Sequence, residues 1–529
     1  MKTIQELERL FDEGKLTRRE FISRVSALGA AATLSPVLFT RHAKAAAPQK
    51  GGKLRIGAPG GATSDNLDPS TLLALIPFLC NQALRSNLVE IDADMKPIPE
   101  LAESFEPSPD ATRWVFKLRR DVEFHNGKTM TAEDVIESLN YHRGETKSAA
   151  KGIMVPVKDI KSDGKHTVII DLNEGNADFP FIISEYHLTI FPAGTKGKDF
   201  DLGIGTGPFK LKEFNPGVRF FAERNPNYFR EGRPYFDEYE LLTINDLNSR
   251  TNALKSGQVD FISRCDTKTF KLLKRLPGIV AADIESARHF TFPMLTTIKP
   301  YDNNDARLGL KYMFDRDQLV SHILMGYGYA GNDHPIARTN RYYAKEIPIR
   351  AYDPEKAKFH LKKAGLLNHT FKLFAAEVAF QGAMDAAVLI KEQAAKAGVK
   401  IDVVREPDDG YWSNVWMKKG WCMSYWSGRP TEDWMFTSVY SADANWNEAL
   451  WKHPRFNELL IKARQELDGA KRREMYIEMQ RIVRDEGASV IPMFANYLEA
   501  YSDKLDHGKV SSLWELDGYR LAERWWFKS

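Results

Sequence analysis

The chain has 529 residues, of which 43% are hydrophobic, 27% charged and 11% aromatic. This composition is typical of a folded globular protein and excludes a fibrous, disordered or disulfide-stapled chain, and the length predicts more than one compact unit. The first 45 residues hold 8 Lys and Arg against 5 Asp and Glu, which leaves 66 basic and 66 acidic residues in the rest of the chain. Residues 46–529 therefore have no net positive charge with which to attract nucleic acid.

The N-terminal 45 residues resemble an export signal. Paired arginines at Arg18 and Arg19 precede a short apolar run over residues 25–39, and small residues follow it. This order predicts a twin-arginine signal peptide over 1–45, cut after Ala45 or Ala47, with the twin-arginine translocase as the export partner. An uncleaved anchor is the alternative, but the run is shorter than the roughly 20 apolar residues that span a bilayer.

The first half of the mature chain is predicted to be rich in strands. Thr112–Leu118 and His166–Leu172 are rich in aromatic and β-branched residues, and turn residues such as Asp163-Gly164 stand near them, which favours antiparallel hairpins. Thr131 is followed by early acidic residues, which predicts a helix start.

The second half shows helical periodicity with short strands between the periodic segments. This alternation predicts an α/β lobe with a partly parallel sheet. The periodic segments are 305–325, 354–364, 383–398 and 454–486.

A set of collinear blocks across the mature chain resembles the family 5 extracellular solute-binding proteins, the dipeptide, oligopeptide and nickel receptors of ABC importers. The blocks lie in the same order as in that family and cover nearly the whole mature chain. They are Leu101–Ser104, Pro109–Thr112, Trp114–Arg119, Val122–Gly127, Thr131–Val135, Gly205–Phe209, Glu223–Tyr228, Ala253–Asp260, Asp305–Leu308, Phe314–Asp317 and Tyr352–Ala357.

The resemblance implies a fold and a division of the chain. The fold class is α/β, a two-lobed periplasmic binding protein of the Venus-flytrap type, with mixed sheets and an extra subdomain in the first lobe. We expect residues 46–290 together with 498–529 to form lobe I, with the subdomain at 86–200. Residues 291–497 are expected to form lobe II.

The resemblance also implies a function. We expect a soluble, exported, monomeric protein of the periplasm that captures a small solute between its lobes and delivers it to the membrane permease of an ABC importer. The solute would be peptide-like or acidic, such as an opine or a peptide derivative. We expect no enzymatic activity, no cofactor and no nucleic-acid partner.

The ligand-specific part of the family matches residues 421–434 here. Peptide-binding relatives carry an Asp shortly after the Trp of this stretch, where it pairs with the ligand's ammonium group, whereas this chain has Arg429. A guanidinium favours an acidic ligand group instead. Two alternatives stay open: a local ion pair of Arg429 with Glu432 or Asp433, and a shifted alignment in which Asp433 is the amine partner.

Aromatic residues and loops complete the predicted ligand site. Clustered rings beside glycines favour ligand contact by Tyr425, Trp426 and Trp412. The facing wall is predicted from the loop that contains Ser64 and Asp65 and from Met294, at the end of a strand expected to cross between the lobes.

Two other function classes were weighed. A metal-chelate or haem carrier of the same fold would need ligand clusters, but the twelve His are scattered and the three Cys (Cys80, Cys265 and Cys422) form no CxxC pair. A secreted glycoside hydrolase would have to use Glu432 and Asp433, which are adjacent on the chain and diverge in a loop.

Overall fold

A computed structural model describes residues 48–407, 411–444 and 446–528. Within it, Gln49–Phe527 form one compact unit. The predicted signal peptide and its cleavage positions lie outside the described residues. Among the described residues, no helix has the length and apolar character needed to cross a bilayer.

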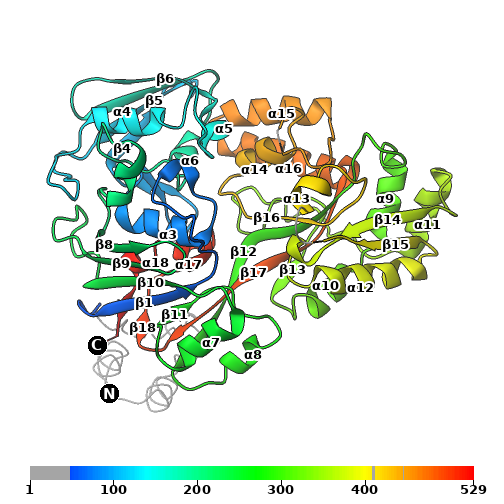
Figure 1. Ribbon diagram of the computed structural model, residues 1–529. Coiled ribbons are helices and arrows are strands. Elements are labelled where there is room, and N and C mark those ends of the chain that lie inside the picture. The colour runs from blue at the N-terminus through cyan, green and yellow to red at the C-terminus, as the bar shows by residue number, and fades with distance from the viewer. Residues whose placement is uncertain (1–47, 408–410, 445, 529) are drawn as a thin grey trace, which may run out of the picture. The chain divides into compact units, whose positions relative to one another are not determined.

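The largest sheet has nine strands and mixed pairing (Figure 1). β1 (Lys53–Ala58) pairs in parallel with β10 and with β11, and the other pairings are antiparallel. The order is β16-β12-β17-β11-β1-β10-β9-β8, and β13 also pairs with β17. The remaining strands are β8 (Phe209–Asn215), β9 (Arg219–Arg224), β10 (Glu238–Thr243), β11 (Phe261–Ile262), β12 (Ile279–Pro293), β13 (Gly328–Ala330), β16 (Ser424–Trp426) and β17 (Ser489–Ser502).

β12 and β17 are the two long strands of this sheet. They pair antiparallel from Ile279 opposite Ser502 to Pro293 opposite Ser489. Figure 1 shows them side by side between two groups of elements, one from residues 53–273 together with the C-terminal tail and the other from residues 304–486. The predicted lobe boundaries, after residues 290 and 497, both fall inside these strands. The chain therefore passes between the two groups as paired sheet strands.

The segment predicted as a subdomain holds a four-stranded antiparallel sheet in the order β4-β5-β7-β6. β5 and β7 confirm the strands expected at 112–118 and 166–172, and α4 follows the predicted Thr131 cap, whose capping box uses Asp134. The elements of residues 75–200 are α3 (Leu75–Leu84), β2 (Val89–Ile91), β3 (Pro97–Pro99), β4 (Ala102–Pro107), β5 (Arg113–Leu118), α4 (Ala132–Asn140), α5 (Lys151–Met154), β6 (Val157–Ser162), β7 (Thr167–Leu172) and α6 (Phe179–Ile183).

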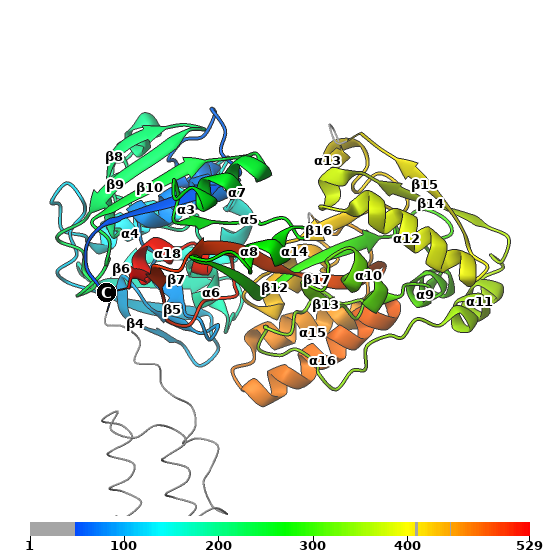
Figure 2. The same ribbon diagram turned by 90° about the horizontal axis from the view of Figure 1, so that it is seen from below.

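The second half is helical, with a parallel pair formed by β14 (Thr370–Ala375) and β15 (Lys400–Arg405). α12 (Ala383–Lys396) connects these strands and packs on them, as Figure 2 shows from below. This is the strand–helix–strand unit that the sequence predicts. The other helices from residue 247 to 486 are α7 (Leu247–Lys255), α8 (Phe270–Leu273), α9 (Asn304–Tyr312), α10 (Arg316–His322), α11 (Pro354–Lys363), α13 (Tyr411–Asn414), α14 (Glu432–Val439), α15 (Pro454–Gln465) and α16 (Gly469–Glu486).

Two of the periodic segments are each divided into two helices. Asp315 caps α10 by accepting from the backbone N–H of Gln318, and Asp468 caps α16 by accepting from the N–H groups of Ala470 and Lys471. Each cap starts a new helix, because it satisfies N–H groups that have no partner inside the helix.

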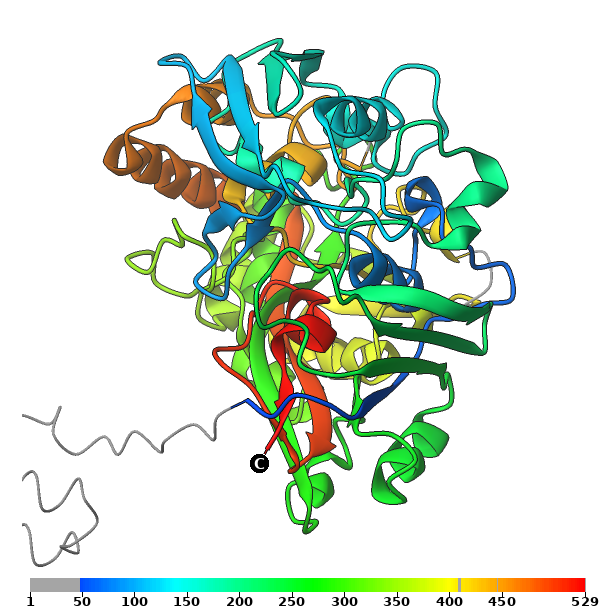
Figure 3. The same ribbon diagram turned by 90° about the vertical axis from the view of Figure 1, so that its left-hand side faces the viewer.

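The C-terminal tail packs on the elements of residues 49–262. Its elements are β18 (Leu505–Asp506), α17 (Glu515–Gly518), α18 (Leu521–Arg524) and β19 (Trp526–Phe527). Trp525 is buried in one cluster with Leu54 and Phe261. The chain end lies beside the start of β1, where Gln49 pairs with Phe527 (Figure 3).

A buried ion pair joins residues far apart in sequence. The guanidinium of Arg472, on α16, pairs with the carboxylate of Asp178, immediately before α6, and one of the two hydrogen bonds is 2.9 Å long. The side chains are only 4% and 6% exposed. A pair this deeply buried leaves an uncompensated charge when one partner is removed.

We therefore expect Arg472→Ala to lower the free energy of unfolding by about 3–5 kcal/mol, measured by urea denaturation. Arg473→Ala is the matched control, because the neighbouring Arg473 pairs with Glu346 at the surface and such pairs contribute about 0–1 kcal/mol. Equal losses in the two variants would contradict this assignment.

Candidate functional site

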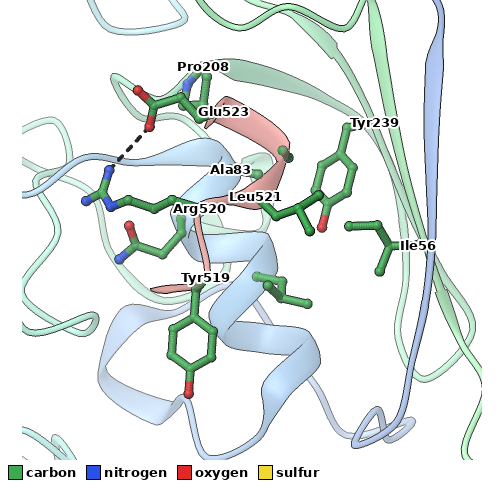
Figure 4. Close-up of a pocket in the computed structure, with 11 residues that line it drawn as sticks. Ile56, Ala83, Pro208, Tyr239, Tyr519, Arg520, Leu521 and Glu523 are labelled. Carbon is green, nitrogen blue, oxygen red and sulfur yellow. Dashed lines mark hydrogen bonds and ion pairs between the residues drawn. The ribbon is translucent and has the colours of Figure 1, made fainter. Parts of the chain in front are cut away.

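A cavity of about 320 Å³ lies along β12 and β17. Its lining comes from these strands, from β16 and the residue after it, from the loops after β11 and after α10, from the segment after β14, and from the C-terminal tail. The volume falls at the lower end of the range of small-molecule sites. A second cavity, of about 10 Å³ beneath α18 (Figure 4), has room for about one water molecule and none for a solute.

Aromatic rings form much of the cavity wall. Phe290 stacks on Phe380 with ring centroids 4.1 Å apart, and Trp514 stacks on Tyr519 at 5.2 Å. Tyr425 of β16 also lines the cavity and is 43% exposed. Flat, rigid rings of this kind suit a small organic solute.

Two arginines and two glutamates line the same cavity. Arg264 donates through Nε to both carboxylate oxygens of Glu515, at 3.0 and 2.9 Å, and Arg288 Nη1 lies 4.0 Å from Glu515 Oε1. Glu515 raises the pKa of the Arg264 guanidinium. Glu499 is the fourth group, and it is 1% exposed.

The buried position of Glu499 favours the neutral form of its carboxyl group. Burial raises its pKa to about 8, and the charges of Glu515 and Asp517 add to this rise. Its Oε1 accepts from the backbone N–H of Leu516 at 2.6 Å, while Oε2 is buried and has no hydrogen-bond partner among the described residues. Among the described residues, Glu515 is therefore the only one of the two glutamates that pairs with the cavity arginines.

Arg429 lies beside the cavity but is not one of the residues that line it. Its Nη1 donates to the carbonyl oxygens of Ser427, at 3.1 Å, and Gly428, at 3.2 Å, and Ser427 itself lines the cavity. The guanidinium lies 5.8 Å from the ring centroid of Trp434. Within the described residues it makes no ion pair.

The two acids considered as local partners of Arg429 have other partners. Glu432 accepts from the backbone N–H of Tyr342 at 2.6 Å, and Asp433 pairs with Arg464 at 3.1 Å. Both side chains are buried and neither lines the cavity. In this structure these carboxylates therefore serve the packing of α14, α15 and the segment near Tyr342.

Of the other two aromatic residues predicted for the site, Trp412 contacts Tyr425 and Trp426 does not face the cavity. Trp412 is 38% exposed, and its ring lies 5.7 Å from that of Tyr425. Trp426 pairs with His289 in the sheet and is buried between Trp416 and Trp446. Side chains alternate along β16, so Tyr425 faces the cavity while Trp426 faces the core.

Three predicted residues lie elsewhere in the fold. Met294 follows β12 and is fully buried in the core that contains Phe292 and Trp421. Ser64 and Asp65 form the turn after β1, where the Asp65 carboxylate accepts from the backbone N–H of Ala62 at 2.8 Å. None of the three lines the cavity, so the structure brings only Tyr425, Trp412 and Arg429 near it.

The charged cavity residues were missed by the sequence analysis. Glu499 is the only charged residue of β17, and a lone charge in an apolar strand is a signal that could have marked it, whereas Arg288 shares β12 with Asp283 and Glu285 and does not stand out. Arg264, in the loop after β11, and Glu515, the first residue of α17, are 251 residues apart, and no local pattern connects them.

No group of three or more His, Cys, Asp or Glu side chains among residues 48–407, 411–444 and 446–528 is arranged to hold a metal ion.

Comparison with known proteins gives consistent matches over most of the chain. A family model described as bacterial extracellular solute-binding proteins, family 5 middle, matches residues 96–448. The glutathione-binding protein GsiB of Pectobacterium atrosepticum is 24% identical over 463 residues, which are 84% of this chain and 89% of that protein.

Two solved structures resemble the whole described chain. The periplasmic binding protein DppA of Helicobacter pylori, in complex with the peptide STSA, has a TM-score of 0.77 at 21% identity and covers 91% of this chain and 99% of its own. AgaA of A. tumefaciens R10, in complex with agropinic acid, has a TM-score of 0.75 at 24% identity, and the match covers 90% of this chain and 99% of AgaA. These matches confirm the predicted two-lobed α/β fold of periplasmic binding proteins.

The buried acid in the cavity predicts a pH dependence of stability. The folded-state pKa of Glu499 is about 8, against an ordinary value of 4.5, so its stabilising contribution is complete below pH 4.5 and is lost as the pH rises to about 8. The free energy of unfolding of wild type should therefore fall relative to that of Glu499→Gln by roughly 1.4 kcal/mol per pH unit over this range.

Urea denaturation of both proteins at pH 5, 6, 7 and 8 measures this difference. Gln keeps an acceptor for the N–H of Leu516 and cannot ionise, so the two curves differ only through the titration of Glu499. A constant difference across the series would show that Glu499 does not titrate in this range.

Proposed function

Because the chain belongs to the family 5 extracellular solute-binding proteins of bacteria, we propose that it is the substrate-binding component of an ABC importer. In this proposal the protein binds a small solute in the cavity along β12 and β17, closes around it, and presents it to a membrane permease. This cavity is the observation that carries the proposal. It is lined by β12 and β17, which connect the two groups of elements, and by loops on both sides of these strands.

The lining of the cavity supports a peptide-like or acidic solute. The stacked rings of Trp514 and Tyr519 supply flat apolar surface, and Arg264 and Arg288 share the single carboxylate of Glu515. Relatives of the chain are named for binding glutathione or are solved with a peptide or with agropinic acid. An opine or a peptide derivative fits these features.

We propose Tyr425 and Arg429 as ligand contacts among the residues predicted from the sequence. Tyr425 lines the cavity, and Trp412 braces its ring. Arg429 is bonded to the carbonyl group of Ser427, a lining residue, and has no carboxylate partner within the described residues, so its charge is available to an acidic ligand group.

The location and chemistry follow from the same proposal. The protein would act in the periplasm after export through the twin-arginine translocase, and it would work as a monomer that returns its solute unchanged. The relatives compared above are named as binding proteins, which supports a role without catalysis.

The first experiment identifies the solute. The protein is purified from its native periplasm, its mass is measured under native conditions, and the solute released on denaturation is identified. A thermal-shift screen with glutathione, peptides, opines and sugar acids complements it, because a ligand of the folded state raises the melting temperature. Chemical conversion of the bound solute by the pure protein would contradict the proposal.

Arg429 gives a prediction of its own. With the released solute, Arg429→Ala should weaken binding by about 2–5 kcal/mol, because the acidic ligand group loses its charged partner in a partly desolvated site. Arg429→Lys should recover only part of this loss, since an ammonium group lacks the planar fork.

Isothermal titration of wild type and both variants measures these affinities. Unchanged affinity in Arg429→Ala, with all three proteins folded, would remove Arg429 from the ligand contacts. The role in transport would still stand.

A further inference from the structure

Two arginines from different parts of the chain face one carboxylate in the cavity. Arg264 comes from the loop after β11, and Arg288 stands on β12 opposite Ala495 of β17. Glu515 of the C-terminal tail lies between them, bonded to Arg264 at 2.9 Å and 4.0 Å from Nη1 of Arg288. The second distance is too long for a hydrogen bond, so Arg288 is only loosely neutralised.

Most hydrogen-bond donors of Arg288 are unused. A guanidinium has five N–H groups, and among the described residues the Arg288 side chain makes one hydrogen bond, from Nη2 to the carbonyl oxygen of Asn496 at 3.2 Å. Its Nε is buried without a partner. The ring of Tyr497 lies 5.5 Å from the guanidinium and fixes one face of it.

The register of β12 explains the position of Arg288. The pairing with β17 shifts between Ile284 and Arg288, and Ser286 within this irregular stretch donates to the carbonyl oxygen of Ala495 at 2.7 Å. The backbone N–H of Arg288 in turn donates to Ser286 Oγ at 3.1 Å. An irregularity of this kind re-aims the side chain that follows it, and here it leaves Arg288 on the cavity wall.

Two neutral polar groups beside the arginines also lack partners. Oδ1 of Asn496 is buried and unpaired within the described residues, although Nδ2 of the same side chain donates to Asp283 at 2.6 Å. Oε2 of Glu499, a side chain that is 1% exposed, is unpaired as well. Buried polar atoms in proteins are nearly always hydrogen-bonded, so these atoms point to a polar occupant of the cavity.

We propose that Arg288, with Arg264 beside it, forms a subsite for a carboxylate or a similar planar acidic group of the solute. The guanidinium groups of Arg288 and Arg264 donate hydrogen bonds to that acidic group. Asn496 Oδ1 accepts from an N–H of the solute next to it, and the carboxyl O–H of Glu499 donates to another oxygen of the solute. This subsite is separate from Arg429. It selects a solute with an acidic group beside an N–H, such as a peptide terminus or an N-substituted amino acid.

The inference rests on the proposed role as a binding protein and makes its solute class specific. Its test uses two probes, each with a neutral counterpart: the peptide STSA against its C-terminal amide, and glutathione against its diethyl ester. The solute released from native protein is tested with its methyl ester in the same way. Affinities are measured by isothermal titration for wild type, Arg288→Gln, Arg288→Lys and Arg264→Gln.

The matched control is Arg275→Gln, which makes the same change of charge at an exposed arginine after α8 that does not line the cavity. Thermal unfolding shows that each variant is folded. If Arg288→Gln does not fold, Arg264→Gln provides the same test from the other side of the subsite.

Wild type should prefer an acid to its neutral form by about 10- to 100-fold, the range for a hydrogen-bonded charge. Arg288→Gln should remove this preference, Arg288→Lys should restore part of it, and Arg275→Gln should keep it. If the preference survives in both Gln variants, or wild type binds acid and neutral form alike, the subsite is overturned while solute binding stands. If wild type binds no probe and releases no solute, the proposed function fails and the subsite fails with it.

Discussion

The pairing of β12 with β17 is the constraint on which the rest of the structure depends. These strands are the two longest of the described residues, and their backbone hydrogen bonds hold them together in one sheet. The cavity lies along them, so its floor is set by sheet register. The shift before Arg288 departs from regular pairing, and it places a charged side chain on the cavity wall.

Two buried arginines of the C-terminal tail are each paired with a carboxylate, whereas the cavity arginines share one. In the core, Arg520 of the tail donates to both carboxylate oxygens of Glu100, at 2.7 and 2.8 Å, and Arg524 pairs with Glu90. Each of these cations is matched by a carboxylate, as burial requires. In the cavity, two arginines share the carboxylate of Glu515, while Glu499, whose pKa is raised by burial to about 8, makes no ion pair among the described residues. This incomplete pairing on a cavity wall fits a site that is completed by an acidic ligand.

Local signals were enough to predict several of the elements, but not the cavity. The Thr131 cap and the strand at 166–172 depend on neighbours in sequence, and both were predicted correctly. The contact of Arg264 with Glu515 depends on how the tail returns to β17, which no local pattern encodes. Met294 was predicted on the cavity wall from its strand, yet it lies beyond the strand's end and packs in the core. The alternation of side chains between the two faces of a sheet predicts the position of a residue only within the strand.

The tail connects core packing to ligand chemistry. Leu516, Asp517 and Tyr519 have φ between 52° and 66°, the left-handed region that costs a residue with a Cβ atom about 1 kcal/mol or more. The loop keeps this shape because Asp517 accepts from the N–H of Ser511 at 2.7 Å and from Trp525 Nε1 at 3.2 Å. The same bend holds Glu515 against Arg264 and presents Tyr519 to the cavity. The packing that anchors the chain end therefore also sets the charge that a solute meets.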